Sequence, residues 1–179
     1  TCVTVTLEGR RPLVAEVQSL LTPSAGGSPR RTVSGVDAAR VNMLLAVLQR
    51  RARFALAQDD CYVATVGGVR LSEPASDLAV AVAVASAKLS APVPQGMIAV
   101  GELGLAGEVR PVPGIGRRVR EAARLGFTRA LVPRSPEPLG EVPAGFTVAE
   151  VGSIGEALAT IPTWTGGGPA AHPEAGPGR

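Results

Sequence analysis

The stretch SEPASDLAVAVAVASAKL at residues 72–89 predicts a helix at the centre of the fold. Ser72 and Pro74 supply an N-terminal cap and a first-turn proline, so the helix is expected over about residues 75–89. Residues 78–87 are apolar on every side of a helix, and such a helix must be covered all round by the rest of the domain. The run is far shorter than the ~20 residues that a membrane-spanning helix needs.

Strand and helix patterns follow one another on both sides of this central helix. Residues 2–8 and 12–21 are expected to form a β-hairpin. A polar loop is then expected over residues 22–34, followed by a helix to about residue 53 that a capping box at Ser34–Asp37 opens. Further strands are expected at 61–66, at 97–100 paired with 107–112, at 130–132 and at 147–151, and further helices at 115–125 and at 153–161 with Ser153 as cap.

Length and composition favour one domain with a tail. The chain has 179 residues, of which 45% are hydrophobic, and this is enough for one core without a disulfide or a metal. We expect the domain over residues 1–162 and a flexible Gly/Pro-rich tail over 163–179. The N-terminus reveals no signal-peptide pattern, so a cytoplasmic location is expected.

The arginines are unevenly distributed. Residues 1–130 contain sixteen basic and ten acidic side chains, whereas residues 131–179 contain two basic and five acidic ones. Aromatic residues make up only 3% of the chain, so clustered arginines favour phosphate contact over base stacking. On the helix at 115–125, Arg117 and Arg120 are expected to face outward. The candidate DNA-binding residues are Arg30, Arg31, Arg50, Arg51, Arg117, Arg118 and Arg120.

Several kinds of catalytic or metal site are not expected. The chain has no P-loop motif, and its only histidine, His172, lies in the expected tail, which argues against a Ser-His-Asp triad and a zinc site. Cys2 and Cys61 are expected as buried structural thiols. Ser76 and Lys88 would lie about 18 Å apart along one helix, too far for a dyad within one chain.

Two motifs, GELGLAGEVRPV at residues 101–112 and SEPASD at residues 72–77, carry a resemblance to a known family. The first is similar to the strand pair of Lon-type protease domains, and the second is similar to the segment that carries their nucleophile. In this alignment Ala75 occupies the position of the catalytic serine. Gly116 occupies the position of the catalytic lysine. The resemblance therefore implies a protease-like domain without its catalytic groups.

A second resemblance is carried by residues 7–13, 28–31, 43–48, 67–74 and 121–127. These segments resemble the C-terminal Lon-like domain of the RadA (Sms) family of bacterial DNA-repair ATPases. The resemblance covers residues 2 to about 160. It implies an α+β fold, a two-layer α/β sandwich of the Lon-protease-domain-like and ribosomal-protein-domain-2-like type. The chain is then expected to be the C-terminal piece of a longer protein.

The same resemblance implies partners and cofactors. Expected partners are DNA, single-stranded or branched, further copies of the chain in a hexameric ring, and the RecA-like ATPase domain of the same longer protein, with no membrane. ATP and Mg²⁺ would bind that ATPase domain and Zn²⁺ a zinc finger, so this chain itself is expected to hold no cofactor. A nucleoid-associated location is implied.

Three functional hypotheses remain open from the sequence. The first is a catalytically inactive scaffold that forms a ring and holds DNA for an attached ATPase. The second is a protein-interaction or purely structural module whose arginines form a solvated face. The third is a peptidase that uses Ser76 with a lysine from a neighbouring subunit. DNA binding that weakens with salt distinguishes the first hypothesis from the second.

Overall fold

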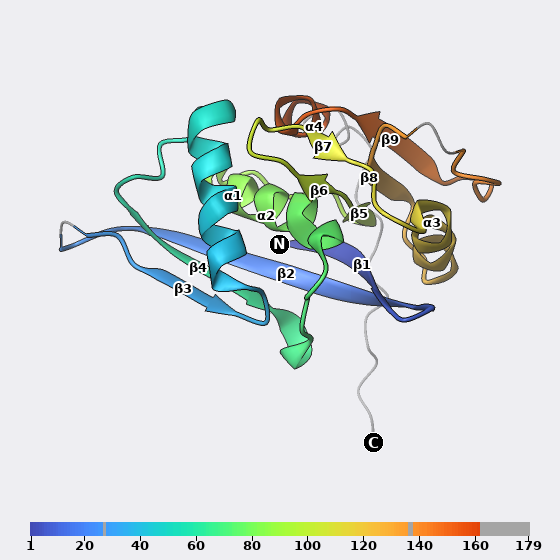
Figure 1. Cartoon of the computed structure of the whole chain (residues 1–179), viewed down its shortest axis with the longest axis horizontal. Helices are drawn as coiled ribbons and strands as arrows, with labels where there is room; N and C mark the ends of the chain where they lie inside the picture. Colours follow the sequence, from blue (N-terminus) through green and yellow to red (C-terminus); the bar gives the residue numbers. More distant parts are fainter. Residues whose placement is uncertain (27, 136–137, 162–179) are drawn as a thin grey trace, which may run out of the picture.

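The computed structural model of the chain describes residues 1–26, 28–135 and 138–161 (Figure 1). The strands among them are β1 Cys2–Glu8, β2 Arg11–Pro23, β3 Arg31–Ser34, β4 Asp59–Thr65, β5 Met97–Ala99, β6 Glu102–Leu103, β7 Val109–Arg110, β8 Arg129–Pro133 and β9 Thr147–Val151. The helices are α1 Ala38–Arg51, α2 Asp77–Leu89, α3 Ile115–Arg124 and α4 Ile154–Thr160, with short 3-10 turns η1 Val66–Gly68 and η2 Pro74–Ser76.

Seven strands form one mixed sheet in the order β3-β4-β2-β1-β5-β8-β9. The pairs β1–β2 and β2–β4 are antiparallel, and the other four pairs are parallel. The predicted N-terminal hairpin is confirmed, with a register that runs from Cys2 opposite Val17 to Glu8 opposite Arg11. Four helices accompany this mostly parallel sheet, which agrees with the expected α+β class.

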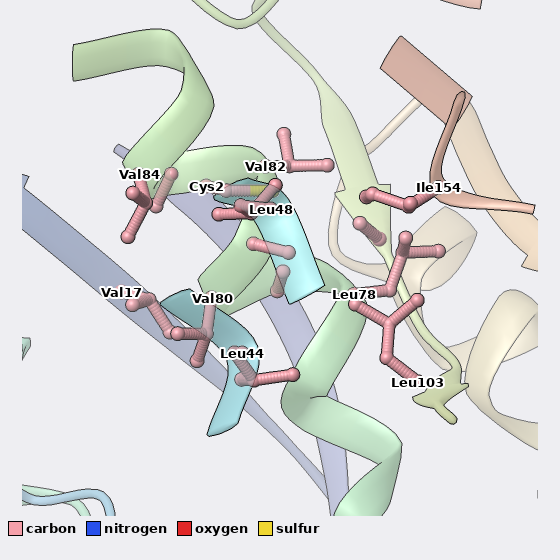
Figure 2. Packing of buried hydrophobic residues seen from close by; sticks show 14 of the residues in the cluster. Cys2, Val17, Leu44, Leu48, Leu78, Val80, Val82, Val84, Leu103 and Ile154 are labelled. Atoms are coloured by element: carbon pink, nitrogen blue, oxygen red, sulfur yellow. The ribbon is translucent and has the colours of Figure 1, made fainter. Parts of the chain in front are cut away.

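Helix α2 forms the centre of the main hydrophobic core, as its apolar sequence predicts. Every residue from Leu78 to Ala85 is at most 1% exposed. Figure 2 shows Leu78, Val80, Val82 and Val84 of this helix among side chains of other elements. The partners come from β1, β2, α1, β6 and α4, and those labelled are Cys2, Val17, Leu44, Leu48, Leu103 and Ile154.

A second core lies on the other face of the sheet, under α3. Side chains alternate across β5: Met97 and Ala99 belong to the core around α2, whereas Ile98 packs with Ile115 and Val119 of α3. The central strands are therefore covered on both faces. Helices α1, α2 and α4 contribute to one core, and α3 contributes to the other.

The predicted pairing of residues 97–100 with 107–112 is wrong. β5 pairs in parallel with β1 and β8, whereas β7 pairs with β6 in a separate two-stranded sheet. All three residues of β5 are buried, as expected for a strand that lies inside the large sheet, between β1 and β8. The chain then reverses between Gly104 and Gly107, where a backbone hydrogen bond closes the turn, and β7 meets the nearest strand instead.

Two further expectations near the N-terminus are corrected. Residues 31–34 form strand β3 along β4, within the segment expected as a loop. Helix α1 is capped by Asp37, whose carboxylate accepts a hydrogen bond from the Arg40 backbone N–H at 2.7 Å, and not by Ser34. Because Ser34 pairs with Ala64, its backbone is extended and lies before the first helical turn.

The described residues include no helix that is long and apolar enough to cross a membrane. The expected tail, with Trp164 and His172, lies outside the described residues, so the expected domain boundary at residue 162 stays a prediction.

Candidate nucleic-acid interface

Helix α3 has an apolar face and a basic face. Ile115 and Val119 lie one turn apart and pack against the sheet, and this fixes how the helix is rotated. The helix begins after Gly114, whose φ of 73° lies in the left-handed region that favours glycine. Arg117 and Arg120 are exposed, as the amphipathic pattern predicts.

The turn of the β1–β2 hairpin brings two more arginines to this helix. Arg117 Nη1 donates a hydrogen bond to the main-chain oxygen of Arg10 at 3.2 Å. A hydrogen bond from Arg124, aided by the nearby charge of Arg11, lowers the pKa of Glu121 on α3. We call the following set the α3 basic patch: Arg10, Arg11, Arg117 and Arg120.

The guanidinium groups of the α3 basic patch are largely free for an external partner. Arg120 has no hydrogen bond or ion pair with any of the described residues. Arg117 uses one of its five N–H donors on Arg10. Together with Arg124, the patch places five positively charged arginines near only two negatively charged side chains, Glu8 and Glu121. The surface is therefore positively charged.

A hollow of about 660 Å³ adjoins the patch. Its lining includes Arg117 and Arg120 of α3 and residues 138–140. Within this lining the backbone of Leu139 approaches Gly116 closely, and a Cβ at Gly116 would lie 2.2 Å from the Leu139 carbonyl oxygen. Position 116 therefore has no room for a side chain.

Arg118 is not part of this surface, which corrects its inclusion among the DNA-binding candidates. It is 1% exposed, and its guanidinium donates to both carboxylate oxygens of Glu73 and to the Val5 main-chain oxygen, at 2.5 to 2.8 Å. Burial raises the pKa of Glu73, but hydrogen bonds from Arg118, Thr6 and the Leu7 N–H outweigh it and hold that pKa below its ordinary value. Arg118 thus joins α3 to β1 and to the segment before α2.

Arg31 is the first residue of β3, and in Figure 1 β3 lies on the opposite side of the molecule from α3. The Arg31 guanidinium donates to the main-chain oxygens of Asp59 and Leu56, so it is largely occupied. The neighbourhood contains Arg30, Arg31 and Lys88 against Asp59 and Asp60, which leaves a small positive excess. The structure therefore does not bring Arg30 and Arg31 together with the basic helix α3.

Arg50 and Arg51 form a third separate group, in the last turn of α1. Both are exposed, and Arg51 Nε donates to the Leu105 main-chain oxygen at 3.3 Å. Basic side chains are favourable at this end of any helix because the helix dipole is negative there. Their position is therefore explained without a ligand.

The positions aligned with the Lon catalytic groups lie beside the core under α3. Ala75 is 2% exposed and packs in the same cluster as Ile115, the neighbour of Gly116. Ser76, the nearest hydroxyl, donates to the Glu73 main-chain oxygen at 3.0 Å. Lys88 lies at the other end of α2, and its Nζ is 2.5 Å from Asp59 Oδ2. No described residue pair here forms a serine–lysine dyad.

The sequence interpretation missed Arg10 and Arg11 as members of the candidate interface. Their signal was available, because both lie in a predicted hairpin turn where side chains extend into solvent. Their contact with α3 joins residues 107 positions apart, and periodicity does not reveal such a contact.

An α+β domain with a mixed sheet, a buried central helix and a basic helix on the second face is thus defined. The family model described as subunit ChlI of Mg-chelatase matches residues 46–136, half of the chain, and the chain belongs to this family.

Longer relatives are named DNA repair protein RadA. The chain is 54% identical to RadA of Mycobacterium tuberculosis (strain ATCC 25618 / H37Rv) over 158 residues, 88% of this chain and 32% of the relative. It is 51% identical to RadA of Mycolicibacterium smegmatis over 161 residues, 90% of this chain and 34% of the relative. It is 44% identical to RadA of Streptococcus pyogenes serotype M1 over 161 residues, which are 90% of this chain and 36% of the relative.

The resemblance to RadA that the sequence motifs indicate is confirmed along about nine-tenths of the chain. The chain spans about a third of the length of these relatives.

Proposed function

We propose that this chain is a non-proteolytic scaffold domain of a DNA repair and recombination ATPase, which binds DNA without sequence preference and assembles into a six-membered ring. The α3 basic patch is the observation that carries the proposal. It presents four arginines from two elements of a chain that is similar to DNA repair proteins. In this proposal the fold is of the Lon-like type, and α3, on the sheet face opposite α1, α2 and α4, adds a third layer to the expected two-layer sandwich.

The chemistry of the patch suits a phosphate backbone. Guanidinium groups bind phosphate through two parallel hydrogen bonds, and those of Arg117 and Arg120 have donors to spare. With three phenylalanines, one tyrosine and one tryptophan in the chain, stacking on bases contributes little. Binding is then electrostatic and independent of sequence, whether the DNA is single-stranded or branched.

Ring assembly and ATP hydrolysis belong to the longer protein in this proposal. The chain corresponds to about a third of the RadA relatives, and the remainder has room for a RecA-like ATPase domain with ATP and Mg²⁺ and for a zinc finger. The present domain holds DNA near the nucleoid while recombination intermediates are processed. Ala75 and Gly116 in place of a dyad support the absence of peptidase activity.

The salt dependence of DNA affinity tests the proposal. Wild-type affinity should fall with increasing salt by about 0.9 log units per log unit of salt for each duplex phosphate neutralised. In Arg117→Ala/Arg120→Ala we expect weaker binding and a slope that is shallower by up to about 2.

The matched control is Arg30→Ala/Arg31→Ala, which removes the same charge at the start of β3, a strand on the opposite side of the molecule from α3. It should retain the wild-type slope. Sedimentation of each variant separates loss of DNA contact from loss of assembly. The proposal fails if the Arg117/Arg120 variant keeps both the wild-type affinity and the wild-type slope.

A further inference from the structure

An apolar groove lies between the C-terminal ends of α2 and α4. It has a volume of about 200 Å³, and none of its lining residues is charged. They are Ala85, Ser86, Leu89, Ala91, Pro92, Val93, Leu158 and Ile161. Leu89 is 62% exposed although it lies among these apolar side chains. The described residues thus leave an apolar surface uncovered at this point.

The chain itself supplies a side chain of the right kind within reach. Ile161 forms part of the groove wall, and Trp164 follows it three residues later. Three residues of extended chain span about 10 Å. An apolar cavity of about 150 Å³ suffices to hold benzene, so the groove has room for an aromatic ring.

Residues 162–179 contain no other large apolar side chain. Apart from Trp164 they consist of glycine, proline, alanine, threonine, one histidine, one glutamate and one arginine. Burial of a tryptophan removes about 150–250 Å² of surface from water, the largest gain that this segment can provide. We propose that Trp164 docks in the groove against Leu89 and Ile161 of the same chain and covers the adjoining ends of α2 and α4.

This docking does not depend on DNA binding, and tryptophan fluorescence tests it directly because Trp164 is the only tryptophan. With excitation selective for tryptophan, the full chain should emit at shorter wavelength than N-acetyltryptophanamide. Iodide should quench the Trp164 emission several-fold less than it quenches N-acetyltryptophanamide. In Leu89→Asp the emission should move to longer wavelength and quenching should rise several-fold, since a carboxylate then lies in the groove.

The matched control is Leu105→Asp, which changes a leucine of similar exposure (70%) in the β6–β7 turn and should leave both signals unchanged. Leu89→Ser, a milder change, serves if Leu89→Asp loses its circular dichroism signal. Emission and quenching equal to those of N-acetyltryptophanamide would overturn the proposal. So would unchanged signals in a folded Leu89 variant. Protection of Trp164 that disappears on dilution, together with a shift in sedimentation, would assign the groove to a second copy instead.

Discussion

Two neighbouring arginines on opposite faces of α3 differ in their surroundings and in their expected roles. Arg117 is exposed and makes one hydrogen bond to a main-chain oxygen, whereas its neighbour Arg118 is 1% exposed and forms a two-pronged ion pair with Glu73. The difference arises from a rotation of about 100° between successive helical residues. Arginines that are neighbours in sequence therefore need not share a surface. Which of them are exposed depends on which face of the helix packs against the core.

The same difference in burial determines whether an arginine of α3 contributes to folding stability or to ligand binding. Removing one partner of a buried ion pair leaves the other charge without compensation, which is strongly destabilising. An exposed arginine contributes little to folding, and its donors remain free for a ligand. On this view Arg118 holds α3 against the sheet, and Arg117 and Arg120 on the exposed face of α3 contact DNA.

The largest effect is expected for Arg118→Ala. It should lower the free energy of unfolding by about 3 kcal/mol, because Glu73 keeps a half-buried charge without its partner. Denaturant titration measures this change. The matched control, Arg117→Ala, should change the same quantity by less than about 0.5 kcal/mol.

Equal effects of the two substitutions would remove the distinction between the faces of α3. A double replacement, Glu73→Leu with Arg118→Met, should recover part of the loss, since apolar residues of similar size often replace a buried ion pair at little cost.

The second prediction concerns the lysine position of the Lon-like alignment. Gly116→Lys should destabilise the domain by about 2 kcal/mol, because the new Cβ meets the Leu139 main-chain oxygen and the backbone must move. Combined with Ala75→Ser, it should not create peptidase activity. Thermal unfolding and a casein-cleavage assay measure the two outcomes.

The control for this prediction is Gly155→Ala in α4. The added Cβ there makes only an ordinary contact of 3.8 Å, and alanine favours helix, so stability should stay equal or rise slightly. Serine-dependent peptide cleavage by the double variant would contradict the account of a closed site.

The third prediction is a pH dependence that belongs to the buried face of α3. Because the pKa of Glu73 in the folded chain lies below its ordinary value of 4.5, the native state binds fewer protons there than the unfolded state. Its contribution to stability is complete above about pH 4.5 and is lost as the pH falls through the lower, folded pKa.

Glu73→Gln should cost about 1.5 kcal/mol at neutral pH by removing a charge-assisted hydrogen bond. Its difference from wild type should narrow as the pH falls below 4.5. Unfolding free energies at several pH values measure this. A difference that stays constant down to pH 2 would show that the Glu73 charge does not act through Arg118.

Local patterns predicted much of the fold. The hairpin, the buried helix α2 and the amphipathic helix α3 follow from spacing that the sequence displays directly. The strands that pair with β5 could not be predicted from the sequence, because three buried residues are compatible with any neighbouring strand in a sheet. β3 was missed because four residues with alternating exposure are too short to stand out from a polar loop.

The candidate site was predicted only in part, for the same physical reason. The outward direction of Arg117 and Arg120 follows from the helix period, but the approach of Arg10 and the burial of Arg118 depend on long-range contacts. Arg30 and Arg31 have the same sequence appearance as Arg10 and Arg11. Only the tertiary fold places one pair beside α3 and the other beside Asp59 and Asp60.

Amide hydrogen exchange with and without duplex DNA tests the central claim most directly, because it reports where DNA lies and not only how tightly it binds. The account predicts slower exchange at residues 9–11 and 117–121 in the presence of DNA, and unchanged exchange at residues 30–32. Protection at residues 30–32 with α3 unchanged, or no protection anywhere at low salt, would contradict the assignment of the DNA surface to the α3 basic patch.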